Sequence, residues 1–212
     1  MAEFNSYLLG KAKRSVGNIT LCYTRRKNIA KAKVFSRKDN PTPEILDQRA
    51  RMKTLVSLSQ KMIPVIRKGF AGIGHGTTSN AFVARNMGAV IVDEKHAGTV
   101  DFDLLKVAAG MLYPPKVAVA YNAESQKYVF EQEMQEVEDG FALQDDKVYG
   151  VLYETELERT RLVTLRDRGE SGSTTYALPE DWNNENVKAY CFATSKNGRQ
   201  ASDSRALTIG ES

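Results

Sequence analysis

Histidine and cysteine are the side chains that proteins use most often for acid–base catalysis, nucleophilic attack or zinc binding, and this chain has two of each. His75 and His96 each lie in a glycine-containing loop, and Asp93 near His96 belongs to a charged string typical of a solvated turn. Cys22 and Cys191 are 169 positions apart and belong to no CxxC or Cys/His cluster, so we interpret each as a small buried residue. No G-x-S-x-G elbow occurs. We therefore predict no catalytic residue, no metal ligand, no cofactor and no enzymatic activity.

Two other motifs could be mistaken for ligand sites. Residues 69–76 (GFAGIGHG) are rich in glycine, but a phosphate-binding loop follows a strand, whereas here the expected helix comes first. We predict a flexible joint there. An acidic run could bind a cation, but it lacks the spacing of a calcium-binding loop, so we predict a solvated acidic face that could also receive a basic arm of a neighbouring subunit. Its members are Glu131, Glu133, Glu136, Glu138 and Asp139.

A basic cluster near the N-terminus is the strongest feature of the sequence. Nucleic-acid phosphates would fit it, with Tyr23 and Phe35 as stacking groups, although no RRM, KH or zinc-finger signature indicates base readout. An acidic protein surface would fit equally well, and the chain carries one. Residues 1–75 have 16 Lys+Arg and 4 Asp+Glu, whereas residues 76–212 have 14 and 22, so we expect protein docking first and keep nucleic acid as the alternative. The cluster comprises Lys11, Lys13, Arg14, Arg25, Arg26, Lys27, Lys31, Lys33, Arg37 and Lys38.

The elements that would position this cluster are an arm and a hairpin. Residues 1–17 lack an apolar period and are predicted to be a mobile arm. Residues 18–24 and 29–35 alternate and read as two strands of a hairpin, with Arg25-Arg26-Lys27-Asn28 between them and Asn28 in the positive-φ position. In the second strand Ala30 and Ala32 share one face, opposite Lys31 and Lys33. Because an isolated hairpin is marginal in water, we expect it to lean on a neighbour.

A long helix should follow, beginning at Pro43 and ending near Lys68, with a kink at Pro64. A second helix is predicted over 77–87 and a short apolar run over 89–92. The apolar stripe predicted for the long helix consists of Ile45, Met52, Leu55, Val56, Ser59, Met62, Ile63 and Ile66.

From residue 100 onward short strand-like runs recur at even spacing, which is typical of a β-sandwich. Asn197-Gly198 is the best hairpin signal in the chain, and Trp182 should fill the core. The predicted strands are 102–108, 116–122, 127–131, 147–154, 160–166, 174–178, 187–194 and 202–209.

The predicted fold class is therefore α+β, with three regions. Residues 1–40 form the basic arm and β-hairpin, 41–99 a helical region with a long α-helix, and 100–212 an immunoglobulin-like or fibronectin-III-like antiparallel β-sandwich. No run of about 20 apolar residues and no secretory signal is visible, so we expect no membrane contact and a location in a cytoplasm or in something assembled there.

Three segments together carry a resemblance. They are the S-V-G-N-I-T segment (15–20), the helix start from Pro41 to Arg51, and a C-terminal pattern comprising Trp182, Val187, Tyr190, Phe192, Gly198, Ser202 and Ser204. On these the chain resembles an uncharacterised family of proteins from gut Bacteroidota and their bacteriophages, including crAss-like phages. The resemblance implies no catalytic residues. It suggests a virion component of a phage neck or tail, similar to ring-forming tail proteins with immunoglobulin-like domains.

Together these features predict a structural subunit that forms a homo-oligomeric ring with copies of itself, beside other neck or tail proteins and in non-specific contact with DNA. The alternatives are a nucleic-acid-binding protein and a surface or carbohydrate-binding sandwich. The location would be the virion, or alternatively the bacterial cytoplasm. The predicted interface residues are Lys11, Lys13, Arg14, Arg25, Arg26, Lys27, Arg49 and Arg51.

Overall fold

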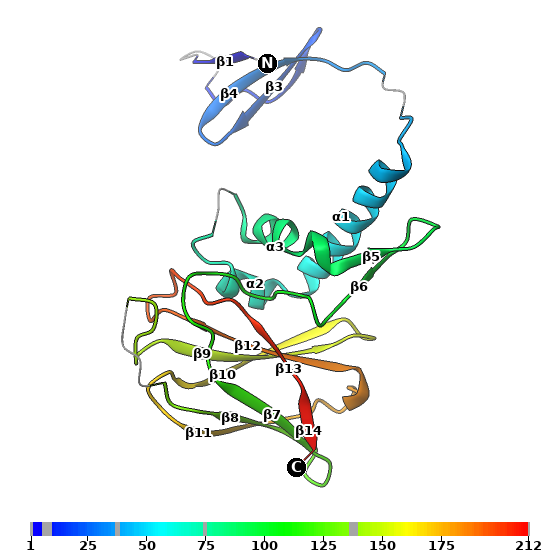
Figure 1. Cartoon of the computed structure of the whole chain (residues 1–212). Coiled ribbons are helices and arrows are strands. Elements are labelled where there is room, and N and C mark those ends of the chain that lie inside the picture. Colours follow the sequence, from blue (N-terminus) through cyan, green and yellow to red (C-terminus); the bar gives the residue numbers. More distant parts are fainter. Residues whose placement is uncertain (1, 6–9, 37–38, 74–75, 136–139, 212) are drawn as a thin grey trace. The chain divides into compact units, whose positions relative to one another are not determined.

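The structure, a computed structural model, describes residues 2–5, 10–36, 39–73, 76–135 and 140–211. The chain forms two compact units, Met1–Thr42 and Pro43–Ser212, so the helices and the sandwich belong to one unit (Figure 1). Its class is α+β with a β-sandwich, as predicted. No described helix is long and apolar enough to cross a membrane. Six residues singled out above lie outside the described ranges: Arg37, Lys38, His75, Glu136, Glu138 and Asp139.

The N-terminal unit is a four-stranded antiparallel sheet in the order β1-β4-β3-β2. Its strands are β1 (Ala2–Phe4), β2 (Arg14–Val16), β3 (Ile19–Thr24) and β4 (Lys27–Ala32). The hairpin β3–β4 was predicted, but the prediction of a mobile arm over the first 17 residues was wrong for its described part. β1 pairs with β4 and β2 pairs with β3, so the backbone groups of both short strands have hydrogen-bonding partners in the sheet. A strand of three residues is too short to show an alternating pattern in the sequence.

The turn of this hairpin differs from the prediction. β3 and β4 are joined by two residues, Arg25 and Arg26, with φ of 49° and 64°. Asn28, predicted at the positive-φ position, instead lies in β4 and is buried. Its side chain accepts a hydrogen bond from Ala12 N at 3.1 Å and donates one to Gly10 O at 2.9 Å, so it holds the preceding segment against the sheet.

The predicted long helix is two helices. α1 (Pro43–Lys61) begins at the expected proline, and α2 (Ile63–Gly69) has Pro64 in its first turn, where the missing N–H does no harm. α3 (Thr78–Asn86) confirms the second predicted helix, and its N-cap Thr77 accepts a hydrogen bond from Asn80 N. A 3₁₀ turn (Met87–Ala89) and the hairpin β5 (Val90–Val92) with β6 (Gly98–Val100) follow.

The predicted stripe of the long helix was half right. Its members Leu55, Met62 and Ile66 are buried, together with Leu58 and Val65. The remaining large apolar members point away from this core and are 38% to 54% exposed. They are Ile45, Met52, Val56 and Ile63.

Six predicted strands of the sandwich are confirmed, as β7 to β12, and with β13 and β14 they form two sheets, β10-β9-β12-β13 and β11-β8-β7-β14. The predicted strand 202–209 is divided: β13 pairs with β12 in the first sheet, and β14 runs parallel to β7 in the second. A strand that changes sheets closes one side of the sandwich, as in immunoglobulin-like folds. The bounds are β7 (Val117–Asn122), β8 (Lys127–Gln132), β9 (Lys147–Glu154), β10 (Arg159–Asp167), β11 (Gly172–Ala177), a 3₁₀ turn (Asn184–Asn186), β12 (Val187–Thr194), β13 (Arg205–Leu207) and β14 (Ile209–Glu211).

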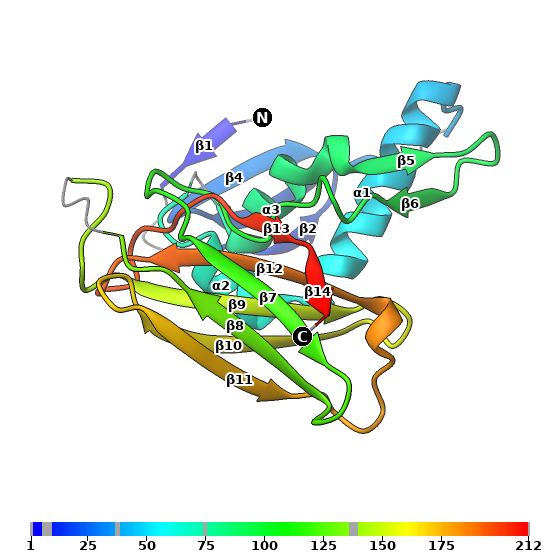
Figure 2. The same cartoon turned by 60° about the horizontal axis from the view of Figure 1, so that its bottom comes forward.

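The second unit has three layers, with the helices on the outer face of the β10-β9-β12-β13 sheet and the second sheet on its other face (Figures 1 and 2). Tyr149, Val151 and Phe192 pack against the helices. Leu152 and Trp182 lie in the core between the sheets, as predicted for the tryptophan. β9 and β12 are therefore covered on both faces, which explains their nearly continuous burial.

The prediction of a strand over 102–108 was wrong. Side chains satisfy the backbone of this segment in place of a partner strand. Asn86 Oδ1 accepts a hydrogen bond from Lys106 N at 2.7 Å, and Ser204 Oγ accepts one from Val107 N at 3.0 Å. The apolar residues of the segment fill the helical core instead, among them Leu105 and Val107.

Both cysteines are free, and Cys22 is half-buried whereas Cys191 is fully buried. Burial raises the pKa of the Cys191 thiol to about 12. The thiolate is the reactive form, so in the native protein near pH 8 iodoacetamide should label Cys22 and spare Cys191, which should react only after unfolding. Peptide mass spectrometry would check this, and rapid native labelling of Cys191 would contradict its burial.

Candidate interaction surface

The N-terminal sheet has one apolar and one polar face. Residues paired across neighbouring strands share a face, and successive residues alternate between faces. Register therefore places Leu21 beside Arg14 and Ala30 on one face, and Thr20 beside Ser15 and Lys31 on the other. The apolar face comprises Ala2, Phe4, Val16, Ile19, Leu21, Tyr23, Ala30 and Ala32, with Arg14 and Asn28.

This apolar face builds no core within its own unit. The two hydrophobic clusters formed by the described residues both consist of second-unit residues. Among the described residues of the N-terminal unit only Ala12 and Asn28 are buried, while Val16 is 69% and Ile19 49% exposed. A single sheet of this size needs a hydrophobic face packed on something else to be stable. The alternation of Ile19, Leu21 and Tyr23 was the sequence signal for this face, although the predicted interface contained only basic residues.

The structure places the first six predicted interface residues on the surface of this sheet. Lys11, Lys13, Arg14, Arg25, Arg26 and Lys27 are all exposed. Arg25, Arg26 and Lys27 gather at the β3–β4 tip, where Lys27 Nζ lies 3.0 Å from Glu3 Oε2. Lys11 Nζ lies 5.4 Å from the centre of the Tyr23 ring, a cation–π contact at the same end of the sheet.

The last two predicted residues, Arg49 and Arg51, lie exposed on α1 in the second unit. Arg49 lies beside the outward apolar stripe formed by Ile45, Met52, Val56 and Ile63, whereas Arg51 lies about a third of a turn away from it. The spacing of Ile45, Met52 and Val56 keeps them on one side of α1, and Ile63 is the first residue of α2. The second unit thus carries an apolar helix surface that its own described residues leave 38% to 54% exposed.

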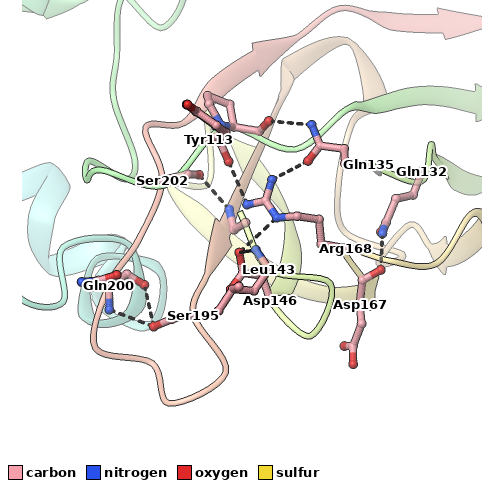
Figure 3. A network of polar contacts seen from close by, with 12 residues as sticks. Tyr113, Gln132, Gln135, Leu143, Asp146, Asp167, Arg168, Ser195, Gln200 and Ser202 are labelled. Atoms are coloured by element: carbon pink, nitrogen blue, oxygen red, sulfur yellow. Dashed lines mark hydrogen bonds and ion pairs between the residues drawn. The ribbon is translucent and has the colours of Figure 1, made fainter. Parts of the chain in front are cut away.

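The most enclosed polar group of the second unit is a network around Arg168 (Figure 3). Arg168 and Asp146 are each 1% exposed, and Nε of the arginine donates to Oδ2 of the carboxylate at 3.1 Å. Arg168 also donates to Gln135 Oε1 and, at 2.8 Å, to Tyr113 O. Burial lowers the pKa of Arg168, against the raising effect of Asp146. Because its donors bind loops from several parts of the sandwich, this group acts as a structural clamp.

The described residues contain no group of three His, Cys, Asp or Glu side chains that could hold a metal ion. His96 Nδ1 lies 2.5 Å from Asp47 Oδ1 and ties the β5–β6 loop to α1. Glu131, near the C-terminal end of β8, and Glu133, just after that strand, are both exposed, and Lys116 Nζ lies 4.0 Å from Glu133 Oε2.

Comparison with known proteins gives a family for the chain. A model described as a family of unknown function (DUF6266) matches residues 11–208. The chain belongs to this family. The match spans both the N-terminal sheet and the sandwich, so the two units are part of one DUF6266 protein rather than a chance fusion.

No curated protein is significantly similar to this DUF6266 chain. Among solved structures, it is similar to the adhesin domain of Epf from Streptococcus pyogenes, with 12% sequence identity and a TM-score of 0.32. The likeness covers 49% of this chain and 34% of that one, so the chain spans about a third of the length of that structure. A likeness this weak does not bear on function.

Proposed function

We propose that the protein is a structural subunit that assembles with copies of itself, and that the apolar face of its N-terminal sheet docks on a neighbouring copy. The observation that carries this proposal is that the sheet leaves Val16 and Ile19 open and buries no core of its own. Burial of such a face on a partner removes apolar area from water, at about 25 cal/mol per Å².

The surface that receives the sheet is proposed to be the outward stripe of α1 in the next copy. Within the N-terminal unit no described helix covers the sheet, and within the second unit the described residues leave the stripe 38% to 54% exposed. Ile45, Met52 and Val56 supply an apolar strip, with Arg49 at its border. A contact between two different surfaces repeats from copy to copy and closes into a ring when the rotation permits.

A neck or tail of a bacteriophage is the proposed place of such a ring. Its support is the resemblance in the 15–20 segment, in the helix start and in the C-terminal pattern, together with an architecture of a docking sheet attached to a sandwich. Portal and tail genes beside the coding sequence would support this location, and a neighbourhood of purely metabolic genes would contradict it.

Ile19→Lys should convert the assembly into monomers. The substitution places an ammonium group on the apolar face beside Val16 and Ala32, where docking would bury it at a cost of several kcal/mol. Thr20→Lys is the matched control, because the neighbouring residue receives the same charge on the opposite face. Mass photometry should show discrete high-order species for the unsubstituted chain and for Thr20→Lys, and monomers for Ile19→Lys. A monomeric unsubstituted chain at high concentration, or equal assembly of both variants, would contradict the proposal.

A further inference from the structure

The tip of the β3–β4 hairpin holds two arginines in a conformation that arginine does not favour. Arg25 and Arg26 form the two-residue turn, with φ of 49° and 64°. Positive φ at both positions is the geometry that Asn-Gly fills with least strain, and a residue with a Cβ loses roughly 1–2 kcal/mol in it. Among the described residues neither guanidinium has an acidic partner. The turn therefore displays two free guanidinium groups at a conformational cost.

The polar face of the same sheet continues the positive charge. Lys27 and Lys31 lie on this face of β4, on either side of Ile29 and next to the hydroxyl groups of Ser15, Thr20 and Thr24, and Lys27 is paired with Glu3 on the same face. These lysines are exposed, and the hydroxyls of Ser15 and Thr20 lie 3.0 Å apart. Residues 1–42 carry 10 Lys+Arg and 2 Asp+Glu, so the unit as a whole is strongly basic. Lysine, arginine, serine and threonine are the side chains that most often contact phosphate oxygens.

An acidic surface of a second copy is the competing partner for this charge. In the second unit, however, many acidic side chains already have a basic neighbour in that unit. The carboxylates of Asp167, Asp181 and Glu158 lie within 4 Å of Lys147, Arg159 and Lys61, respectively. Asp145, Asp203 and Glu133 are paired in the same way. A basic tip that docked on these six carboxylates would have to displace lysines and arginines already in place, whereas every phosphate of a nucleic acid is open to it.

We propose that the Arg25–Arg26 tip and the adjoining polar face bind the phosphate backbone of duplex DNA without reading its bases. This activity goes beyond self-assembly and uses the face of the sheet opposite to the apolar one. The tip and this face offer guanidinium, ammonium and hydroxyl groups, which contact phosphate oxygens, so binding depends on released counterions and weakens steeply with salt.

The test uses the full chain and a fluorescein-labelled duplex of random sequence, with anisotropy measured at several salt concentrations. Arg25→Asn/Arg26→Gly removes both guanidinium groups and gives the turn its preferred residues, so the sheet stays folded. Two lost phosphate contacts should lower the salt slope of log K by about 2 and the affinity by about tenfold at low salt. Lys95→Asn/Lys188→Asn removes two exposed charges from the second unit and should leave the slope unchanged.

Three results would overturn the proposal. The first is no anisotropy change for the unsubstituted chain at the lowest salt. The second is an equal loss in the Lys95/Lys188 control, because net charge alone would then account for binding. The third is displacement of the duplex by polyglutamate at an equal concentration of charge, which would assign the tip to acidic protein instead. A reduced slope confined to Arg25→Asn/Arg26→Gly would support it.

Discussion

Replacing Arg168 by methionine should lower the free energy of unfolding of the second unit by about 3–5 kcal/mol, because the carboxylate of Asp146 would remain buried without its counter-charge. The substitution also leaves Gln135 Oε1 and Tyr113 O without the donors that they have in the native protein. Buried acceptors that lose their donor add to the cost. For a protein of this size the loss corresponds to a fall in Tm of about 10 °C.

Urea unfolding followed by the fluorescence of Trp182 would measure this loss, because the only tryptophan lies in the sandwich core. Arg159→Met is the matched control. Arg159 and Asp181 are also an ion pair, but each side chain is more than half exposed, and such pairs contribute about 1 kcal/mol or less. Equal losses in Arg168→Met and Arg159→Met would show that burial does not set the strength of the Arg168–Asp146 pair.

Gly110→Ala should destabilise the second unit by roughly 3 kcal/mol or more, at the upper end of the range for overpacking. A Cβ at this position would lie 1.8 Å from the carbonyl oxygen of Ala201. This obstacle is backbone, so no side-chain rotation can relieve it. The nearby backbone is also fixed, because Leu112 N donates to Ala201 O and Gly110 N donates to Asp203 Oδ1.

Gly88→Ala is the matched control for Gly110→Ala. A Cβ at Gly88 meets no atom within 4 Å, and its φ is not positive, so alanine should be neutral or slightly stabilising there. The same urea titration serves for both variants. A neutral Gly110→Ala would mean that the 109–112 loop does not approach the 200–203 segment as closely as described.

The sandwich could be predicted because its strands are separated by strong turn signals. Residues 127–131 and 187–194 are rich in β-formers, and Asn197-Gly198 marks the hairpin after β12, where Gly198 has φ +66. The division of 202–209 between two sheets could not be predicted. It depends on which strand each half meets, β12 for Arg205–Leu207 and β7 for Ile209–Glu211.

The errors in the helical region have a common cause. Ile45 and Met52 have the same apolar character as Leu55 and Met62, so the sequence alone cannot tell which side of the helix faces the sheet. Residues 102–108 are apolar enough for a strand, but Asn86 and Ser204, distant in sequence, provide their hydrogen bonds. Contacts between distant segments decide both cases, and local periodicity does not contain them.

In the candidate surface, the sequence identified the basic residues of the hairpin, but it did not predict that Arg25 and Arg26 form the turn. Asn28 has a higher preference for positive φ than Arg25 or Arg26, so turn statistics favoured the wrong position. The pairing of Thr24 with Lys27 leaves only two residues for the turn, and register overrides the local preference.

The helices that cover β9 and β12 also limit how this protein can be cut for engineering. A fragment starting at residue 100 would retain every strand of the sandwich. It would also expose to solvent one continuous apolar surface, formed by Tyr149, Val151, Tyr153, Tyr190 and Phe192. Such a fragment would be prone to aggregate, whereas in a fragment starting at Pro43 the helices would still cover that apolar surface. A fusion of the sandwich to another protein should therefore include all of residues 43–212.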